Sequence, residues 1–250
     1  MDNLKELKNK TVLVTGSNGD IGHAVALLAL KNGAKVVGVD VKFAKHNFYP
    51  VIVGFLGSGD LPSLDFKGNR FDYVIHVAGG ALQDEIDSEE LTDDLVTIHT
   101  TVQNNFLSAV DVVLATKNLI NSQGSVTFIS SINAYVDYGL PIYSAMKASL
   151  EGFMNGLLPE MNSKNVRVNV ATLGTVLTSN VKKLYKNDKE YTENMSLDIP
   201  GGVSHTPESV AFEILDVALS NQSGQVFLLD KGQMDFKRNN RSSKITQLRF

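Results

Sequence analysis

The stretch TVLVTGSNGDIG, residues 11–22, decides the fold class of this 250-residue chain. Its first five residues are β-branched or apolar without alternation, which is typical of a strand buried on both faces of a parallel sheet. Three glycines follow at once and lead into residues 21–31, a predicted helix that stops at Asn32-Gly33. A strand, a glycine turn and a helix in this order predict the phosphate-binding corner of a Rossmann-type fold.

Strands and helix-length segments alternate along the rest of the chain. Apolar runs of strand length occur at residues 35–40, 51–55, 73–77, 126–130, 166–171 and 225–229, and helix-length segments occupy 88–117 and 143–161. Because strands separated by helices pair in parallel with right-handed crossovers, we expect a three-layer α/β/α fold with a doubly wound parallel sheet. No linker or repeat divides the pattern, so residues 1–250 are predicted to form a single domain.

Three polar segments need their own interpretation. Residues 235–250 form a basic tail, expected to be a solvated terminus or a subunit contact, with a site for a phosphorylated ligand as the alternative. Residues 84–94 are acidic and are expected to form a solvated helix face. Residues 178–206 could cover a substrate or form an ordinary pair of surface helices.

The composition excludes several classes of protein. A net charge of −4 and a pI near 5.7 argue against nucleic acid or an anionic membrane as an obligate partner. No apolar run approaches the roughly 18 residues of a membrane span, and the N-terminal residues lack the apolar core of a secretory signal. The chain has no cysteine, and its five histidines lack metal-site spacing, so no metal is expected. We expect a cytoplasmic protein.

The glycine turn is the first candidate binding site. Glycines permit a sharp turn and a close approach of pyrophosphate, and the helix that follows offers unpaired N–H groups. A plain strand-to-helix turn is the alternative. Either Asp20 or Asn18 could cap the helix. The residues expected to bind a dinucleotide here are Gly16, Ser17, Asn18, Gly19, Asp20 and Ile21.

Asp40 ends the second predicted strand, 24 residues after Gly16. A carboxylate at this position can accept both hydroxyls of an adenosine ribose and would repel a 2′-phosphate. NAD(H) is therefore favoured over NADP(H), although the basic residue Lys42, two positions further on, makes that preference moderate. The alternative for Asp40 is a surface acid at the end of a strand.

Tyr143 and Lys147 form the candidate reactive pair. Their i, i+4 spacing places a phenol and an ammonium on one helix face. A nearby cation lowers the pKa of a tyrosine, which a tyrosine acid or base requires at neutral pH. Upstream, residues 124–131 predict a strand that delivers Ser130 and Ser131 at its carboxyl end, the edge where ligands bind in open parallel sheets.

In this ordered set of motifs the sequence resembles the short-chain dehydrogenase/reductase family, from about residue 11 to residue 232. The matching segments are Thr15 to Gly22 for the glycine motif, His76-Val77-Ala78-Gly79 for Asn-Asn-Ala-Gly, the serines with Tyr143 and Lys147, residues 165–170 for the sixth strand, Gly174 to Thr178 for Pro-Gly-x-x-x-Thr, and residues 223–232 for the last strand. Leu173 stands where proline is usual.

The resemblance implies roles for these residues. Tyr143 would protonate a carbonyl oxygen or deprotonate an alcohol, and Lys147 would lower its pKa and bind the nicotinamide ribose. A serine would bind the substrate oxygen. The spacing to Tyr143 favours Ser130, whereas the match of the Ile-Ser-Ser sequence to the family motif favours Ser131. We prefer Ser131.

Further roles follow from the same resemblance. Asn105 would support a proton relay through water to Lys147, with Asn104 as the competing position. Ala78 and Gly79 would contact the cofactor, and Val176 and Thr178 would hold the nicotinamide carboxamide. The family also implies an alcohol or carbonyl substrate and a homodimer or homotetramer.

Some features depart from the family pattern and leave alternatives open. The glycine spacing is that of the extended, epimerase-like branch, but the chain lacks the longer C-terminal domain of that branch. The sequence Val-Ala-Gly-Gly at residues 77–80 is similar to that of dihydropteridine reductase. The prediction is an NAD(H)-dependent alcohol dehydrogenase or carbonyl reductase. The alternatives are an NADH-dependent reductase similar to dihydropteridine reductase, an epimerase or dehydratase that retains NAD, and a catalytically idle NAD-binding regulator.

Overall fold

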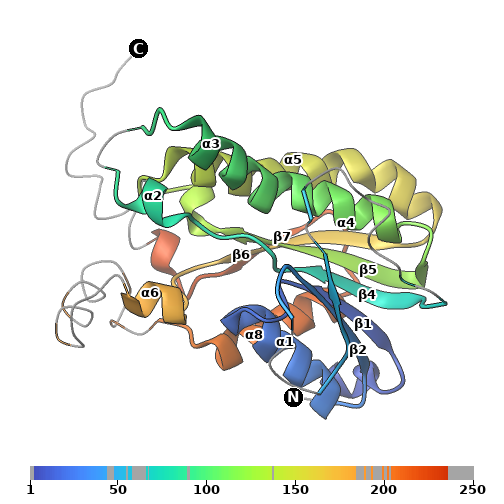
Figure 1. Cartoon of the computed structure of the whole chain (residues 1–250). Helices are drawn as coiled ribbons and strands as arrows, with labels where there is room; N and C mark the ends of the chain where they lie inside the picture. Colours follow the sequence, from blue (N-terminus) through green and yellow to red (C-terminus); the bar gives the residue numbers. More distant parts are fainter. Residues whose placement is uncertain are drawn as a thin grey trace.

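In the part of the chain that the computed structural model describes, seven strands form one parallel sheet (Figure 1). The structure describes residues 3–43, 48–54, 56–57, 66, 68–88, 91–136, 138–183, 189, 193, 199, 202 and 204–235. The strand order is β3-β2-β1-β4-β5-β6-β7. The bounds are β1 Thr11–Thr15, β2 Lys35–Asp40, β3 Val51–Val53, β4 Phe71–His76, β5 Ile120–Ser131, β6 Arg167–Leu173 and β7 Val226–Leu229. The prediction of a doubly wound α/β sheet is confirmed.

Helices cover both faces of the sheet. In Figure 1, α3 (Leu95–Val102), α4 (Ser108–Thr116) and α5 (Pro141–Ser163) lie on one face, and α1 (Asp20–Lys31) and α8 (Pro207–Leu219) lie on the other. Shorter elements are η1 (Asn3–Leu7), α2 (Gln83–Ile86), the π-helical η3 (Gln103–Leu107), η4 (Ile132–Ala134) and α6 (Ser179–Lys183). The layers follow from the strand sequences, whose apolar runs have side chains to bury on both faces.

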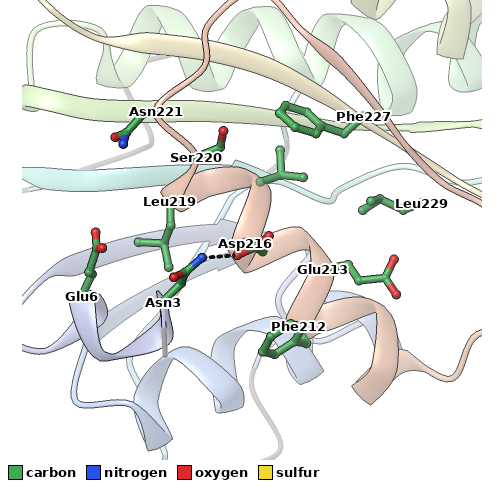
Figure 2. Close-up of a pocket in the computed structure, with 11 residues that line it drawn as sticks. Asn3, Glu6, Phe212, Glu213, Asp216, Leu219, Ser220, Asn221, Phe227 and Leu229 are labelled. Carbon is green, nitrogen blue, oxygen red and sulfur yellow. Dashed lines mark hydrogen bonds between the residues drawn. The ribbon is translucent and has the colours of Figure 1, made fainter. Parts of the chain in front are cut away.

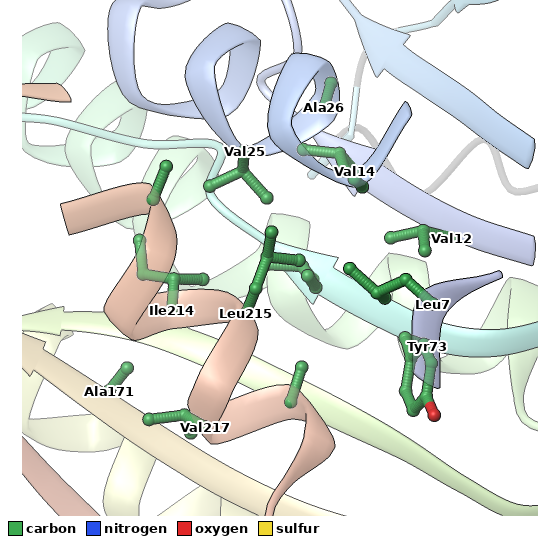
Figure 3. Packing of buried hydrophobic residues seen from close by; sticks show 14 of the residues in the cluster. Leu7, Val12, Val14, Val25, Ala26, Tyr73, Ala171, Ile214, Leu215 and Val217 are labelled. Atoms are coloured by element: carbon green, nitrogen blue, oxygen red, sulfur yellow. The ribbon is translucent and has the colours of Figure 1, made fainter. Parts of the chain in front are cut away.

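Each face has its own hydrophobic core. Figure 3 shows the core under α1 and α8, where Val12 and Val14 of β1 meet Val25 of α1 and Leu215 of α8. All four side chains are fully buried. On the other face, Phe128 of β5 packs with residues of α4 and α5. The sheet is therefore fixed from both sides, which makes the carboxyl ends of its strands a rigid edge for a site.

The predicted helix at 88–117 differs most from the structure. Its regular part begins at Leu95, because the side chain of Asp94 accepts from Val96 N at 3.1 Å and Thr97 N at 3.0 Å and so starts the helix there. Within it, residues 103–107 widen to a π-helix. Most of residues 178–206, all of residues 236–250 and part of residues 43–70 lie outside the described residues, so the expectations for a substrate cover and a basic tail stay predictions.

Candidate active site

The predicted site residues lie at the carboxyl ends of the strands. Gly16 follows β1, Asp40 ends β2, His76 ends β4 and Ser131 ends β5. The segments α2 and α6, which follow β4 and β6, lie at this same end of the sheet in Figure 1. Because all paired strands run parallel, residues from distant parts of the sequence meet at one edge.

The glycine turn packs directly against the end of β4. Gly16 has φ +63°, and a Cβ there would lie 2.9 Å from the backbone N and Cα of Ala78. The hydroxyl of Thr15 accepts hydrogen bonds from Val77 N and Ala78 N, each at 3.1 Å. A Cβ on Gly22 would lie 2.2 Å from the Gly16 carbonyl oxygen, so the start of α1 needs glycine there as well. The turn is thus a tight backbone surface.

No side chain of the described residues caps α1, whose N-cap is Gly19. The expectation that Asp20 or Asn18 caps the helix is therefore wrong. The Asp20 carboxylate instead accepts a hydrogen bond from Ser179 N at the start of α6, and the Asn18 side chain donates to the Lys42 carbonyl at 2.7 Å. The positive end of α1 is left without a side-chain acceptor.

Asp40 is held by the backbone. Its Oδ2 accepts from Asn18 N at 2.9 Å, and its Oδ1 accepts from Lys42 N at 3.1 Å. These bonds fix a carboxylate between the glycine turn and the end of β2. Each carboxylate oxygen has a further lone pair, so both can still accept hydroxyl groups.

Sequence reasoning missed Tyr49, which precedes β3 and is 5% exposed. Its hydroxyl donates to the Ser17 carbonyl at 2.8 Å and lies 2.9 Å from His23 Nδ1. Burial, and then the negative charge of Asp40, raise the pKa of Tyr49 to about 12, so the phenol keeps its proton and stays a donor. A single tyrosine before a strand gives no sequence signal for this role.

Tyr143 and Lys147 lie together in the first turns of α5. Lys147 Nζ is 5.6 Å from the centroid of the Tyr143 ring and donates to the Ile129 carbonyl at 3.1 Å. Burial lowers the pKa of Lys147 to about 8. The pKa of Tyr143 is raised, because burial outweighs the lowering effect of a hydrogen bond with Ser131, and the charge of Glu85 raises it further. The net effect is opposite to the lowering that the i, i+4 spacing predicted.

The two candidate serines point to different partners. Ser131 is partly exposed and forms the hydrogen bond with Tyr143, and its Oγ lies 2.9 Å from Asn133 Oδ1. Ser130 is 3% exposed and donates to the Lys147 carbonyl at 2.9 Å. The structure therefore brings Ser131, Tyr143 and Lys147 together, whereas Ser130 supports the backbone of α5.

Asn105 is fully buried in the π-helical η3 and fixes the loop after β4. Its Oδ1 accepts from Gly80 N at 2.8 Å, and its Nδ2 donates to the carbonyls of Gly80 and Thr101, both at 3.0 Å. Gly79 has φ +123°, and a Cβ there would lie 2.5 Å from Asn105 Oδ1. Asn104, the competing position, offers its carbonyl to the Ser108 hydroxyl at 2.7 Å.

Val176 and Thr178 lie where the chain leaves β6. Val176 is 6% exposed and forms a parallel bridge with His205. The Thr178 hydroxyl accepts from Val181 N at 3.2 Å and so caps α6. Because Asp20 accepts from Ser179 N, this segment is tied to the glycine turn.

Comparisons with known proteins identify the family. A family model described as enoyl-(acyl carrier protein) reductase matches residues 63–233, more than half of the chain. The crystal structure of a short-chain dehydrogenase/reductase family oxidoreductase from Burkholderia thailandensis superposes with a TM-score of 0.81 at 24% identity, covering 97% of this chain and 99% of that one. The chain belongs to the short-chain dehydrogenase/reductase family.

Curated relatives cover nearly the whole chain. An uncharacterized oxidoreductase of Schizosaccharomyces pombe is 25% identical over 90% of this chain and 91% of its own length. The 2,3-dihydro-2,3-dihydroxybenzoate dehydrogenase of Escherichia coli is 26% identical over 90% and 95%. The chain is thus an oxidoreductase of the short-chain dehydrogenase/reductase family.

His76 departs from the Asn-Asn-Ala-Gly motif of the family and was missed as a functional candidate. It is 1% exposed, and its Nδ1 lies 2.9 Å from Thr15 Oγ1 while its Nε2 lies 3.2 Å from Ser108 Oγ. Burial, and then the positive charge of Lys147, lower the pKa of His76 to about 3. The ring is therefore neutral and links the glycine turn to Ser108, the first residue of α4, which directly follows η3.

Other features of the described residues lie apart from this edge. No group of three or more His, Asp or Glu residues suited to a metal ion occurs among them. None of their helices is long and apolar enough to cross a membrane. Figure 2 shows a pocket of about 380 Å³ between η1, α8 and β7, where Asn3 donates to Asp216 at 3.0 Å. Its lining includes none of the predicted site residues.

Proposed function

We propose that this chain interconverts a secondary alcohol and a ketone or related carbonyl with NAD(H), and that Tyr143 exchanges the proton. The observation that carries the proposal is the grouping of Ser131, Tyr143 and Lys147 at the sheet edge that also bears the glycine turn. A hydride transfer of this kind needs a bound dinucleotide and a nearby group for the hydroxyl proton. Residues of this edge offer candidates for both roles, and this supports the proposal.

The glycine turn fits a dinucleotide. The surface at Gly16 has no room for a Cβ on its inner side, and α1 begins without a side-chain cap, so its N–H groups suit a pyrophosphate. A bound nicotinamide supplies or accepts the hydride. We infer that the cofactor is held by Gly16, Ser17, Asn18, Gly19, Asp20 and Ile21 at the turn, Asp40 at the ribose, Ala78 and Gly79 beyond β4, Lys147, and Val176 and Thr178 beyond β6.

The preference for NAD(H) over NADP(H) rests on Asp40. The backbone N–H groups of Asn18 and Lys42 hold its carboxylate beside the glycine turn. A 2′-phosphate placed there would meet a fixed negative charge, whereas two ribose hydroxyls would find acceptors.

Tyr143 then handles the proton. Burial raises the pKa of its phenol, so at neutral pH it is protonated and serves as the acid in carbonyl reduction. In the reverse direction the phenolate takes the alcohol proton while the ammonium of Lys147 stabilises its charge. Ser131 binds the substrate oxygen, and Asn105 keeps the loop at Gly79 and Gly80 in place.

The substrate class is a small secondary alcohol, ketone, polyol or sugar-like compound. The relative from Escherichia coli is named 2,3-dihydro-2,3-dihydroxybenzoate dehydrogenase, and the two hydroxyl groups in the name of its substrate support this class. We also infer a homodimer or homotetramer, which would cover exposed apolar side chains on one helical face, Leu107 (37%) and Leu114 (46%). Light scattering of the purified protein measures that state.

The test is Tyr143→Phe, with Tyr73→Phe as the matched control. Tyr73 is a buried tyrosine of β4 that is outside the proposed site. We expect Tyr143→Phe to bind NADH with unchanged affinity, measured by cofactor fluorescence, and to lose at least about a hundredfold in kcat, the scale of acid–base catalysis. Normal turnover by Tyr143→Phe would refute the mechanism.

The substrate panel separates the other functions. It contains secondary alcohols, ketones, polyols and a quinonoid dihydropteridine, each assayed with NAD(H) and NADP(H). Turnover of the dihydropteridine alone would indicate a reductase of that type. Cofactor that stays bound through purification, with product formed and no net NADH, would indicate an epimerase or dehydratase. NADH binding with no turnover of any compound would indicate a regulator.

A further inference from the structure

Helix α5, which carries Tyr143, begins without a cap of its own. Its N-cap residue, Leu140, has φ 54° and ψ 62° and makes no side-chain hydrogen bond to the helix. The first helical residue is Pro141, which has no N–H group. The next two N–H groups, of Ile142 and Tyr143, both donate to one oxygen of Glu85, Oε1, at 3.0 Å.

Glu85 reaches this helix from a different part of the fold. It lies in α2, after β4, and is only 3% exposed. Its other oxygen, Oε2, accepts from the hydroxyl of Thr101 in α3 at 3.3 Å. The expectation of a solvated acidic face is wrong for this residue, although its neighbours Asp84 and Asp87 are exposed.

A buried carboxylate is costly unless it is hydrogen-bonded, and Glu85 has three donors and the positive end of a helix. These contacts do more than stabilise α5. The N–H of Tyr143 is itself one of the groups that Glu85 binds, so the carboxylate fixes the backbone from which the phenol extends.

We propose that Glu85 is a positioning residue for Tyr143: by capping α5 from α2, it sets the position of the phenol relative to Ser131 and Lys147. This inference rests on the proposed function, because that function gives Tyr143 its role. The hydrogen bonds between Glu85 and the start of α5 are independent of that role. It adds a residue from the acidic segment to the site, and it couples the loop after β4 to the start of α5.

The carboxylate also acts on the phenol through its charge. The groups that face the phenol are Ser131 from β5, Lys147 from α5 and Glu85 from α2. The charge of Glu85 raises the pKa of Tyr143. Glu85→Gln keeps an acceptor for the two N–H groups and removes the charge, whereas Glu85→Ala removes both. The two effects are therefore separable.

The first experiment measures the cap. Hydrogen exchange at the amides of Ile142 and Tyr143 is followed by NMR in the full chain, with Asp84→Asn as the matched control, since Asp84 is the exposed acid next to Glu85. We expect Glu85→Ala to speed exchange at both amides about five- to tenfold, as expected for loss of one cap, while Glu85→Gln and Asp84→Asn change it much less. Unchanged exchange in Glu85→Ala would overturn the proposal.

The second experiment measures the phenol. The titration of Tyr143 is obtained from tyrosinate absorbance by subtracting the curve of Tyr143→Phe. We expect the pKa of Tyr143 to fall in Glu85→Gln, and the pH profile of kcat for alcohol oxidation to move to lower pH with it. Asp84→Asn should shift neither. Equal titrations in Glu85→Gln and Asp84→Asn would also overturn the proposal.

These readouts are independent of turnover. If Tyr143→Phe proved active, the proposed function would fail while the exchange and titration results would still decide whether Glu85 holds Tyr143. Should a Glu85 variant fail to fold, Thr101→Val removes one donor to Glu85 and leaves its charge in place. We expect a smaller increase of exchange at the same two amides, and no increase would count against the proposal.

Discussion

The imidazole of His76 lies 2.9 Å from the hydroxyl of Thr15, measured from Nδ1 to Oγ1, and joins the end of β4 to the glycine turn after β1. The Thr15 hydroxyl already accepts from Val77 N and Ala78 N, so its own proton goes to Nδ1. The ring proton therefore sits on Nε2 and is donated to Ser108, whose hydroxyl donates to the Asn104 carbonyl. One neutral histidine fixes both the turn and η3.

This arrangement predicts a pH dependence of stability. The pKa of His76 is about 3 in the folded chain and near 6.5 in the unfolded chain, so below pH 6.5 only the unfolded state takes up the proton. The contribution of His76 is complete above pH 6.5, and we expect a loss approaching 1.4 kcal/mol per pH unit as pH falls below that value. Urea unfolding between pH 7.5 and 5 measures the loss. The slope should flatten in His76→Asn, which cannot titrate; an equal slope in both proteins would contradict the assignment.

The adjacent serines of β5 give a matched pair for the second prediction. Ser131→Ala removes the hydroxyl that bonds Tyr143, and we expect kcat to fall about ten- to a hundredfold with NADH binding kept. Ser130→Ala removes a donor to the Lys147 carbonyl, and we expect a stability loss of about 1 kcal/mol with kcat within about threefold of wild type. Steady-state kinetics and urea unfolding of both variants are the measurements. A reversed pattern would move the substrate contact to Ser130.

This pair also shows where sequence reasoning stops. Neighbouring residues of a strand point to opposite faces, so only one of the two serines can face Tyr143. The sequence motif does not say which one, and Ser130 and Ser131 therefore remained alternatives. The fold itself could be predicted from residues 11–22 and the alternation after them, because the periodicity of buried strands and the glycine turn are local properties. The direction of one hydroxyl depends on how α5 packs on β5, which is a tertiary property.

Glu85 and His76 were missed for the same reason. A glutamate among acids has the composition of a solvated face, and only the packing of α2 against α5 buries it. A lone histidine at a strand end has no spacing signal, and its two hydrogen-bond partners, Thr15 and Ser108, lie far from it in the sequence. Asp94 shows the opposite case, since its helix cap is local, yet the predicted helix began at residue 88, inside the acidic segment, and so missed the start of α3.

Asp40 provides the third prediction. Asp40→Ser removes the negative charge beside the glycine turn while keeping a small polar side chain. We expect the ratio of kcat/KM for NADH to that for NADPH to fall at least about tenfold. A tenfold change corresponds to about 1.4 kcal/mol, which is less than the repulsion expected between the Asp40 carboxylate and a 2′-phosphate. Kinetics with both cofactors provide the measurement, at low and high salt. A ratio that does not change would show that Asp40 is only an acid at the end of a strand.

The glycine turn gives the last prediction. In Gly16→Ala the new Cβ would lie 2.9 Å from the backbone of Ala78, and the residue would have to keep φ +63°. Gly68 has nearly the same φ, +71°, with nothing within 4 Å of a Cβ, so Gly68→Ala isolates the cost of the backbone conformation at about 1 kcal/mol. Gly19 has φ −76°, and its Cβ would meet only the Gly16 carbonyl at 3.3 Å, so Gly19→Ala should cost less than either. We expect urea unfolding to show a larger loss of stability in Gly16→Ala than in Gly68→Ala. We also expect fluorescence titration to show that Gly16→Ala, unlike Gly68→Ala, loses at least about tenfold in NADH affinity. The reason is that the turn must move away from Ala78, and the N–H groups that face the pyrophosphate move with it. Equal losses of stability and of NADH affinity in the two variants would mean that the contact with Ala78 does not determine the shape of the glycine turn.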